Sequence, residues 1–114
     1  MERGVGVARE LNRGEIWHYT FRTPDKRRPV VVLSRDDVIG LLRTVTVAPI
    51  TSTIHGAPSE VVVGPEEGLK HTCAINLDHI ATVERSQLVK YVGRLNESRL
   101  EEVCRALLIA LGCR

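Results

Sequence analysis

The spacing of apolar and polar positions predicts a chain made mainly of short strands. Residues 14–21 are rich in strand-forming side chains, and their alternation places Ile16 on one face and Trp17 on the other. The continuous apolar run at residues 30–33 is typical of a strand that is buried on both faces. A strand at residues 44–48 is expected to end at Pro49, and shorter strands are expected at residues 60–63, 72–75, 80–83 and 91–95.

The hydrophobic period changes near the C-terminus. From Leu100 to Leu111 the apolar residues recur at three- and four-residue spacing, which predicts an amphipathic helix. Either Asn96 or Ser98 can cap the start of this helix, and Gly112 marks its end. Short strands followed by one packed helix predict a small α+β or β-barrel domain.

The chain is expected to hold one folded domain. Its 114 residues suffice for a single core, and residues 13–114 contain all the predicted elements, including a helical turn expected within residues 34–43. Residues 1–12 are weakly patterned and lack the apolar core of a signal peptide. We therefore expect them to form a flexible N-terminal extension.

Composition places the chain among ordinary globular proteins that act in the cytoplasm. It is 43% hydrophobic and 26% charged, and its few aromatic residues imply a core of Val, Ile and Leu. Its three cysteines form no C-x-x-C pair, which argues against a disulfide scaffold or a structural zinc site and fits a reducing compartment. No apolar run approaches the roughly 20 residues needed to span a bilayer.

Basic residues gather in the segment between the first two predicted strands. Arg22, Lys26, Arg27 and Arg28 lie within seven residues, accompanied only by Asp25. Clustered cations raise the local potential and favour a polyanion, although a solvated loop explains the same pattern. The formal net charge of +2 does not decide between these two interpretations.

Three segments resemble one protein family in their order and separation. They are RGEIW at residues 13–17, RPVVVLS at residues 28–34 and VAPITST at residues 47–53, and together they resemble the MazF/PemK family of toxins. The later segments 76–80 and 92–95 and the terminal helix also fall where that family places its last strands and helix. The resemblance covers about residues 13 to 112.

The resemblance implies a fold, an activity and partners. The fold would be a small SH3-like, strongly curved β-barrel (CcdB/PemK-like) with a C-terminal amphipathic helix, assembled as a homodimer. The activity would be that of a toxin endoribonuclease of a toxin–antitoxin system, which cleaves single-stranded mRNA, rRNA or tRNA at short specific sequences. Attack by the RNA 2′-hydroxyl would leave a 2′,3′-cyclic phosphate and a 5′-hydroxyl without metal or cofactor. A MazE-like antitoxin would place its acidic and apolar tail in the RNA groove.

Two residues match the catalytic positions of that family. Arg28 matches its catalytic arginine, and a guanidinium suits the stabilisation of charge on phosphate oxygens. Thr51 matches its catalytic threonine, whose hydroxyl can donate to a phosphate oxygen or orient the 2′-hydroxyl. The same residue types also occur without any catalytic role at strand starts and within sheets.

The other candidate residues are assigned to RNA binding or proton transfer. The family commonly carries a G-S-E-like element before its arginine, and the shorter loop of this chain lacks it, so the general base stays open between Asp25 and His55. His18 is expected to be a strand-face residue and His71 and His79 to lie in loops. The candidate RNA-binding residues are Lys26, Arg27, Ser52, Thr53 and Asp78, and Asx-turn chemistry also explains the last of them.

Three alternative functions share this scaffold. A non-nucleolytic toxin that acts on DNA gyrase is one, because fold does not fix function. An inactive RNA-binding or regulatory module is the second, and the altered loop is its main support. A structural SH3-like adaptor is the third, and the scarcity of aromatic residues argues against its peptide groove.

Overall fold

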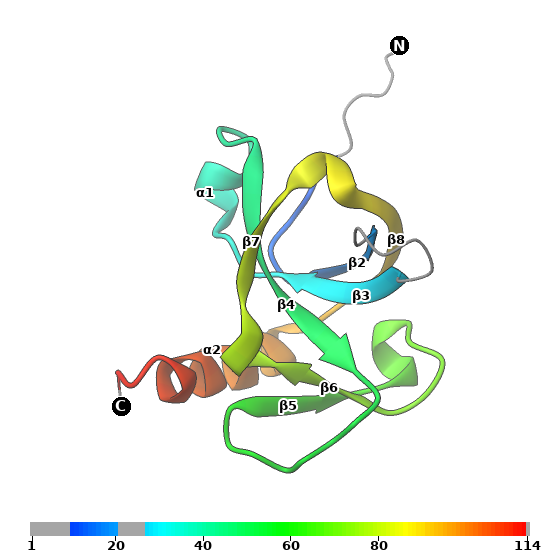
Figure 1. Ribbon diagram of the computed structural model, residues 1–114, viewed down its shortest axis with the longest axis vertical. Coiled ribbons are helices and arrows are strands. Elements are labelled where there is room, and N and C mark those ends of the chain that lie inside the picture. The colour runs from blue at the N-terminus through cyan, green and yellow to red at the C-terminus, as the bar shows by residue number, and fades with distance from the viewer. Residues whose placement is uncertain (1–9, 21–26, 114) are drawn as a thin grey trace.

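The computed structural model describes residues 10–20 and 27–113. These residues build short strands, two α-helices and three single turns of 3₁₀ helix, arranged as in Figure 1. The strands are β2 (Glu15–Thr20), β3 (Arg27–Val32), β4 (Thr44–Thr51), β5 (Glu60–Val63), β6 (Cys73–Asn76), β7 (Ala81–Glu84) and β8 (Leu88–Arg94). The helices are α1 (Asp36–Ile39) and α2 (Glu97–Ala110), and the 3₁₀ turns are η1 (Pro65–Glu67), η2 (Leu77–His79) and η3 (Arg85–Gln87).

The strands form one antiparallel sheet in the order β5-β6-β4-β3-β2-β8, and β7 pairs with β4. Figure 1 shows that this sheet is strongly curved, with α2 lying against it on the side of β5 and β6. Among the described residues no pairing joins β5 to β8, so the curved sheet stays open. The predicted α+β class and the predicted C-terminal helix are confirmed.

The long strand β4 passes through Pro49, so the prediction that this strand ends there is wrong. β4 pairs with β7 through Thr44–Val47 and with β6 through Ile50 and Thr51. Pro49 lies between these two partners, where its missing N–H breaks no pairing on that side. On the other side it lies opposite Val30 of β3. The change of partner at a proline bends the sheet here.

The sheet is buried on both of its faces. Alternation sends Ile16 and Val31 into one apolar cluster with β5, β6 and α2, and Trp17 and Val30 into a second cluster with β7 and β8. The predicted burial of residues 30–33 on both faces is therefore confirmed. The second cluster also contains Leu11, so the fold includes residues that we had assigned to the N-terminal extension.

Helix α2 begins and ends as its sequence predicts. The Asn96 side chain accepts a hydrogen bond of 2.8 Å from the Arg99 backbone N–H, so Asn96, rather than Ser98, is the N-cap. Gly112 follows the helix with a φ of +75°. Val103 and Ala106 are the buried residues of the helix, and they pack into the first cluster.

A buried carboxylate joins α2 to the turn η1. Glu67 is only 4% exposed; its Oε1 accepts from the Gly64 N–H at 2.7 Å and its Oε2 from the Arg99 Nε at 3.3 Å. Arg99 also pairs with Glu102 on the same helix at 3.0 Å. The Glu67 side chain thus fixes the turn that precedes Gly68.

Replacing Glu67 with alanine is expected to destabilise the protein by about 2 to 3 kcal/mol, because a buried N–H and a half-buried guanidinium lose their partner. Glu102→Ala removes a second carboxylate from the same arginine at a more exposed position and should cost less than about 1 kcal/mol. Urea unfolding of both variants measures the difference. Equal losses in the two variants would contradict the role of Glu67.

Candidate active site

A cavity opens where the ends of β3 and β4 meet β2, β8 and the segment between η1 and β6. Its volume is ≈ 600 Å³, which lies in the range of ligand-binding pockets. It is lined by residues of five segments, namely His18, Arg28, Pro29, Ile50, Thr51, Ser52, Gly68, Leu69, Lys70, His71, Cys73, Lys90, Tyr91 and Val92. Three of these residues are cationic, and none is Asp or Glu.

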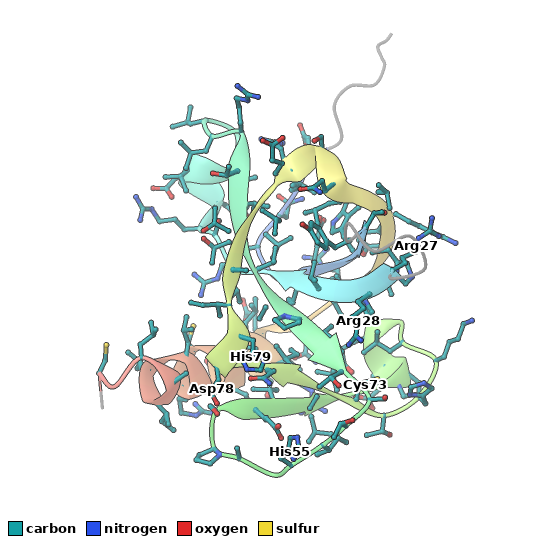
Figure 2. The ribbon with its side chains drawn as sticks, viewed as in Figure 1. Arg27, Arg28, His55, Cys73, Asp78 and His79 are labelled. Atoms are coloured by element: carbon teal, nitrogen blue, oxygen red, sulfur yellow. The ribbon has the colours of Figure 1, made fainter. Side chains whose placement is uncertain are left out.

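Strand register brings Arg28 and Thr51 together. Val30 lies opposite Pro49 in the antiparallel pair of β3 and β4, and two steps further along each strand lead to Arg28 and Thr51. Figure 2 shows Arg28 beside the end of β4. Both residues line the cavity, Arg28 exposed and Thr51 half-buried.

The hydroxyl of Thr51 is held by the backbone that follows it. Its Oγ1 accepts a hydrogen bond of 3.1 Å from the Thr53 N–H. A hydroxyl can donate once and accept twice, so this contact leaves its own hydrogen available for a ligand oxygen. Ser52 lies next to it and is exposed in the cavity wall.

His18 also lines the cavity, from β2, which is paired with a strand on each side. It faces Pro29 in β3 and Lys90 in β8, and its side chain is half-buried. Among the described residues its Nδ1 is buried without a hydrogen-bond partner. Burial, and then the charges of Arg27, Lys90 and Lys70, lower the pKa of His18 below its ordinary value. The imidazole is therefore neutral at neutral pH.

The segment before β6 supplies the cavity with a second histidine beside a thiol. The Nδ1 of His71 lies 3.5 Å from the Sγ of Cys73 and 3.4 Å from the Thr72 carbonyl oxygen. Burial raises the pKa of the Cys73 thiol, which keeps it protonated. In the described part of the chain, no three His, Cys, Asp or Glu side chains are grouped as metal ligands.

The structure brings together some of the predicted site residues and leaves others outside the cavity. Arg28, Thr51 and Ser52 line the cavity. Arg27 is not among the lining residues, but its positive charge helps to lower the pKa of His18, which is one of them. Thr53 does not line the cavity, but its N–H donates a hydrogen bond to the Thr51 hydroxyl. Asp25 and Lys26 lie outside the described residues.

Two predicted candidates lie away from the cavity. His55 is exposed in the loop after β4, where its N–H donates to the Glu60 carboxylate at 3.1 Å. Asp78 accepts the Ser59 hydroxyl at 2.5 Å, and its N–H donates to the Asn76 side chain, as an Asx turn requires. Figure 2 shows Asp78 and His79 beyond the far end of β6, toward α2.

The part of the cavity wall that β2, β8 and the η1–β6 segment build was not predicted from the sequence. Lys70 and Lys90 belong to no recognisable motif. His18 was correctly predicted to lie on a strand face, but no chemical role was assigned to it. The one available signal was that His18 interrupts the apolar face begun by Ile16. A polar residue in that position marks the end of the core.

The lowered pKa of His18 predicts a dependence of stability on pH. The unfolded chain binds this proton near pH 6.5, whereas the folded protein binds it only at lower pH. The contribution of neutral His18 to stability is therefore full above about pH 6.5 and is lost as the pH falls through the folded value. Between about pH 7.5 and about pH 5, the melting temperature of the wild type should fall further than that of His18→Gln. Equal falls would contradict the assignment.

Comparisons with known proteins agree on one family. A family model described as a PemK-like, MazF-like toxin of type II toxin–antitoxin systems matches residues 12–111. The probable endoribonuclease MazF5 of Mycobacterium tuberculosis is 44% identical over 102 residues, which cover 89% of this chain and 93% of that protein.

Solved structures extend the agreement to the fold. The Mycobacterium tuberculosis toxin MazF-mt6 superposes with a TM-score of 0.80 at 33% identity, over 86% of this chain and 96% of that one. A chain of the MazE-MazF crystal structure from Deinococcus radiodurans gives a TM-score of 0.77 at 25% identity, over 92% and 98% of the two chains. No helix in the described part of this chain is both long and apolar enough to cross a membrane.

Proposed function

Because this chain belongs to the family of PemK-like, MazF-like toxins of type II toxin–antitoxin systems, we propose that it is an endoribonuclease whose active site is the cavity at the ends of β3 and β4. The observation that carries the proposal is the meeting of Arg28 and Thr51 in a cavity whose described lining holds three cations and no carboxylate. Such a cavity suits a phosphodiester. Relatives named as probable endoribonucleases support the same activity.

The reaction uses a nucleophile that RNA itself carries. The 2′-hydroxyl oxygen attacks the adjacent phosphorus, the bond to the 5′-oxygen breaks, and a 2′,3′-cyclic phosphate and a 5′-hydroxyl result. The protein must place the 2′-oxygen in line with the leaving oxygen, move two protons and stabilise the charge on the phosphorus oxygens. We propose that the side chains of the protein support this reaction without a metal ion.

Arg28 is proposed to stabilise the pentacoordinate phosphorus. Its guanidinium offers a planar fork of donors to two phosphate oxygens and stays charged at every physiological pH. Strand pairing holds its backbone opposite Tyr19 of β2, and two residues later β3 also pairs with β4. The position is therefore organised before RNA binds, which is the condition under which electrostatic stabilisation is strongest.

Thr51 is proposed to donate its hydroxyl hydrogen to a phosphate oxygen or to the 2′-oxygen. The contact from the Thr53 N–H occupies one acceptor site of the hydroxyl and orients it. A threonine hydroxyl is too weak a base to remove the 2′-hydroxyl proton by itself. Its part is positioning and hydrogen bonding.

Single-stranded RNA is the proposed substrate, held by the cations around the cavity. Lys70 and Lys90 line the same cavity as Thr51, and Arg27 directly precedes Arg28 in β3. These charges bind phosphates irrespective of sequence, so recognition of a short sequence requires contacts to base edges from residues such as Ser52 and Thr53. We propose cleavage at specific sites on that basis.

The proposed partners are a second copy of the chain and an antitoxin. The MazE-MazF structure from Deinococcus radiodurans supports an antitoxin of the MazE type. A tail with acidic side chains would complement the cations of the cavity and compete with RNA for it. We place this system in the cytoplasm, where the RNA substrates are.

The proposal is tested with purified protein and a long single-stranded RNA in the presence of EDTA. Discrete cuts whose downstream fragments carry 5′-hydroxyls are expected. Uniform degradation would point to a contaminating nuclease and would not support the proposal. No cutting of several unrelated RNAs, with inhibition of DNA gyrase in a parallel supercoiling assay, would overturn it in favour of a gyrase toxin.

A further inference from the structure

The cavity holds few groups that can accept a proton at neutral pH. Its described lining contains no Asp or Glu. Arg28, Lys70 and Lys90 are cations, and the Cys73 thiol is kept protonated by burial. Ammonium groups and phenols likewise retain their protons near neutral pH. The two histidines of the cavity are the remaining proton acceptors among its described residues.

The two histidines differ in how firmly they are held. His18 lies within β2, paired on both sides, and is half-buried. His71 is exposed on the segment before β6, where its ring nitrogen Nδ1 lies near the Thr72 carbonyl and the Cys73 thiol. A general base must be held at hydrogen-bonding distance from one oxygen, so the fixed imidazole is the better candidate.

The two nitrogens of His18 have different surroundings. Nδ1 is buried and has no hydrogen-bond partner among the described residues. Because the side chain nevertheless lines the cavity, Nε2 is the nitrogen that a substrate can reach. The imidazole therefore presents one nitrogen to the same space that Arg28 and Thr51 border.

We propose that His18 is the general base of the RNA cleavage reaction, an assignment that rests on the function proposed above. Its Nε2 takes the proton of the 2′-hydroxyl while the 2′-oxygen forms its bond to phosphorus. The bond from phosphorus to the 5′-oxygen breaks, and the electron pair leaves with that oxygen, which takes a proton from water. The imidazolium then returns its proton to water, so the enzyme is unchanged.

The groups around His18 keep it in the form that a base requires. The charges that act on it come from three elements: Arg27 from β3, Lys90 from β8 and Lys70 from the segment before β6. Arg28 borders the same cavity. The other polar side chains of the cavity are those of Thr51, Ser52, His71, Cys73 and Tyr91. Surrounding cations disfavour the imidazolium in the free enzyme. When the phosphate enters, its negative charge offsets them and helps the imidazole to accept a proton.

The test compares His18→Gln and His18→Asn with wild type on one mapped RNA site under single-turnover conditions. Loss of a general base is expected to slow cleavage about 10²- to 10⁴-fold. The matched control is His79→Gln, because His79 is an exposed histidine beyond the far end of β6, and it should cut at the wild-type rate. Two further measurements check that the variants fold and bind RNA. Their melting temperatures, and their affinities for an RNA with a 2′-deoxy nucleotide at the cut site, should match those of wild type.

The pH profile distinguishes a base from a structural residue. The kcat/KM of wild type should fall on the acid side, with a midpoint below about pH 6.5, because protonated His18 cannot act. The residual activity of His18→Gln should lack this acid limb. If His18→Gln keeps the limb and Asp25→Asn loses it, the proposal is overturned and Asp25 is the base.

A substrate with a sulfur atom in place of the 5′-oxygen separates base from acid. A thiolate leaves without protonation, so the loss of a general acid is repaired with this substrate and the loss of a general base is not. His18→Gln should remain slow on it by about the same factor as on ordinary RNA. Recovery to the wild-type rate would overturn the proposal by making His18 the acid. If the wild type itself cuts no RNA, the proposed function fails. If the wild type cuts RNA and the His18 variants cut it at the same rate, the proposed function stands and the assignment of His18 as the base fails.

Discussion

Replacing Arg28 with alanine is expected to slow RNA cleavage about 10²- to 10³-fold, the usual cost of removing one preorganised donor to the transition state. The side chain is exposed at the start of β3, so its loss should leave the fold intact. Arg28→Lys keeps the charge but loses the planar fork, and we expect it to recover only a small part of the rate. Single-turnover cleavage of one mapped RNA site measures both variants.

A matched control separates the loss of the Arg28 side chain from the change in net charge of the protein. Arg43→Ala removes an exposed arginine from the turn before β4, away from the cavity, and alters the net charge equally. It should cut within about twofold of wild type, since charges farther away than a Debye length are largely screened. Cleavage by Arg28→Ala at the same rate as Arg43→Ala would show that the active site lies elsewhere.

Replacing Gly93 with alanine is expected to give the largest loss of stability, because two backbones meet there. A Cβ on Gly93 of β8 would approach the Glu67 carbonyl oxygen to a distance at which real atoms are never found. A Cβ on the adjacent Gly68, whose φ is +97°, would lie 2.5 Å from the Val92 carbonyl oxygen. Neither backbone can yield as a side chain would. We expect a loss of about 3 kcal/mol, at the upper end of overpacking costs.

Thermal unfolding checks this prediction against a glycine in open space. A loss of about 3 kcal/mol should lower the melting temperature of Gly93→Ala by about 10 °C or more. Gly40→Ala is the control, because no atom lies within 4 Å of its added Cβ and its φ is −76°. Unchanged stability of Gly93→Ala would mean that η1 does not pack against β8 as described.

This contact also links the fold to the cavity. Gly68 and Leu69 follow η1 directly and line the cavity wall, and Val92 lines it from β8. The close approach of Gly68 to Gly93 therefore sets the width of the cavity on this side. A bulkier residue at either position should disturb RNA cleavage as well as stability.

Local patterns were sufficient to predict most elements of this fold. The apolar run at residues 30–33, the three-four spacing in α2 and the end of that helix at Gly112 all depend on neighbours in sequence, and all are confirmed. Of the two N-caps that the sequence allows, Asn96 or Ser98, the helix uses Asn96. Pro49 was misjudged because its tolerance depends on where β4 changes partners. That is a property of the sheet, which the local sequence does not contain.

The candidate site was predictable only where a family motif marked it. Arg28 and Thr51 lie in two such motifs, and strand register brings them together. His18 and Lys90 carry no motif and become neighbours only through the pairing of β2 with β8. The base candidate His55 was chosen for its proximity to Thr51 in sequence, but the loop after β4 carries it away from the cavity.

The most direct test of the central proposal removes the nucleophile from the RNA instead of a group from the protein. One ribose at a mapped cut is replaced by 2′-deoxyribose, and the rest of the oligonucleotide is left as RNA. If the cavity of Arg28 and Thr51 promotes attack by the 2′-hydroxyl, the protein should bind this RNA as before and no longer cut it at that position. Continued cutting at the deoxy nucleotide would contradict the account, because the nucleophile would then have to come from water or from the protein.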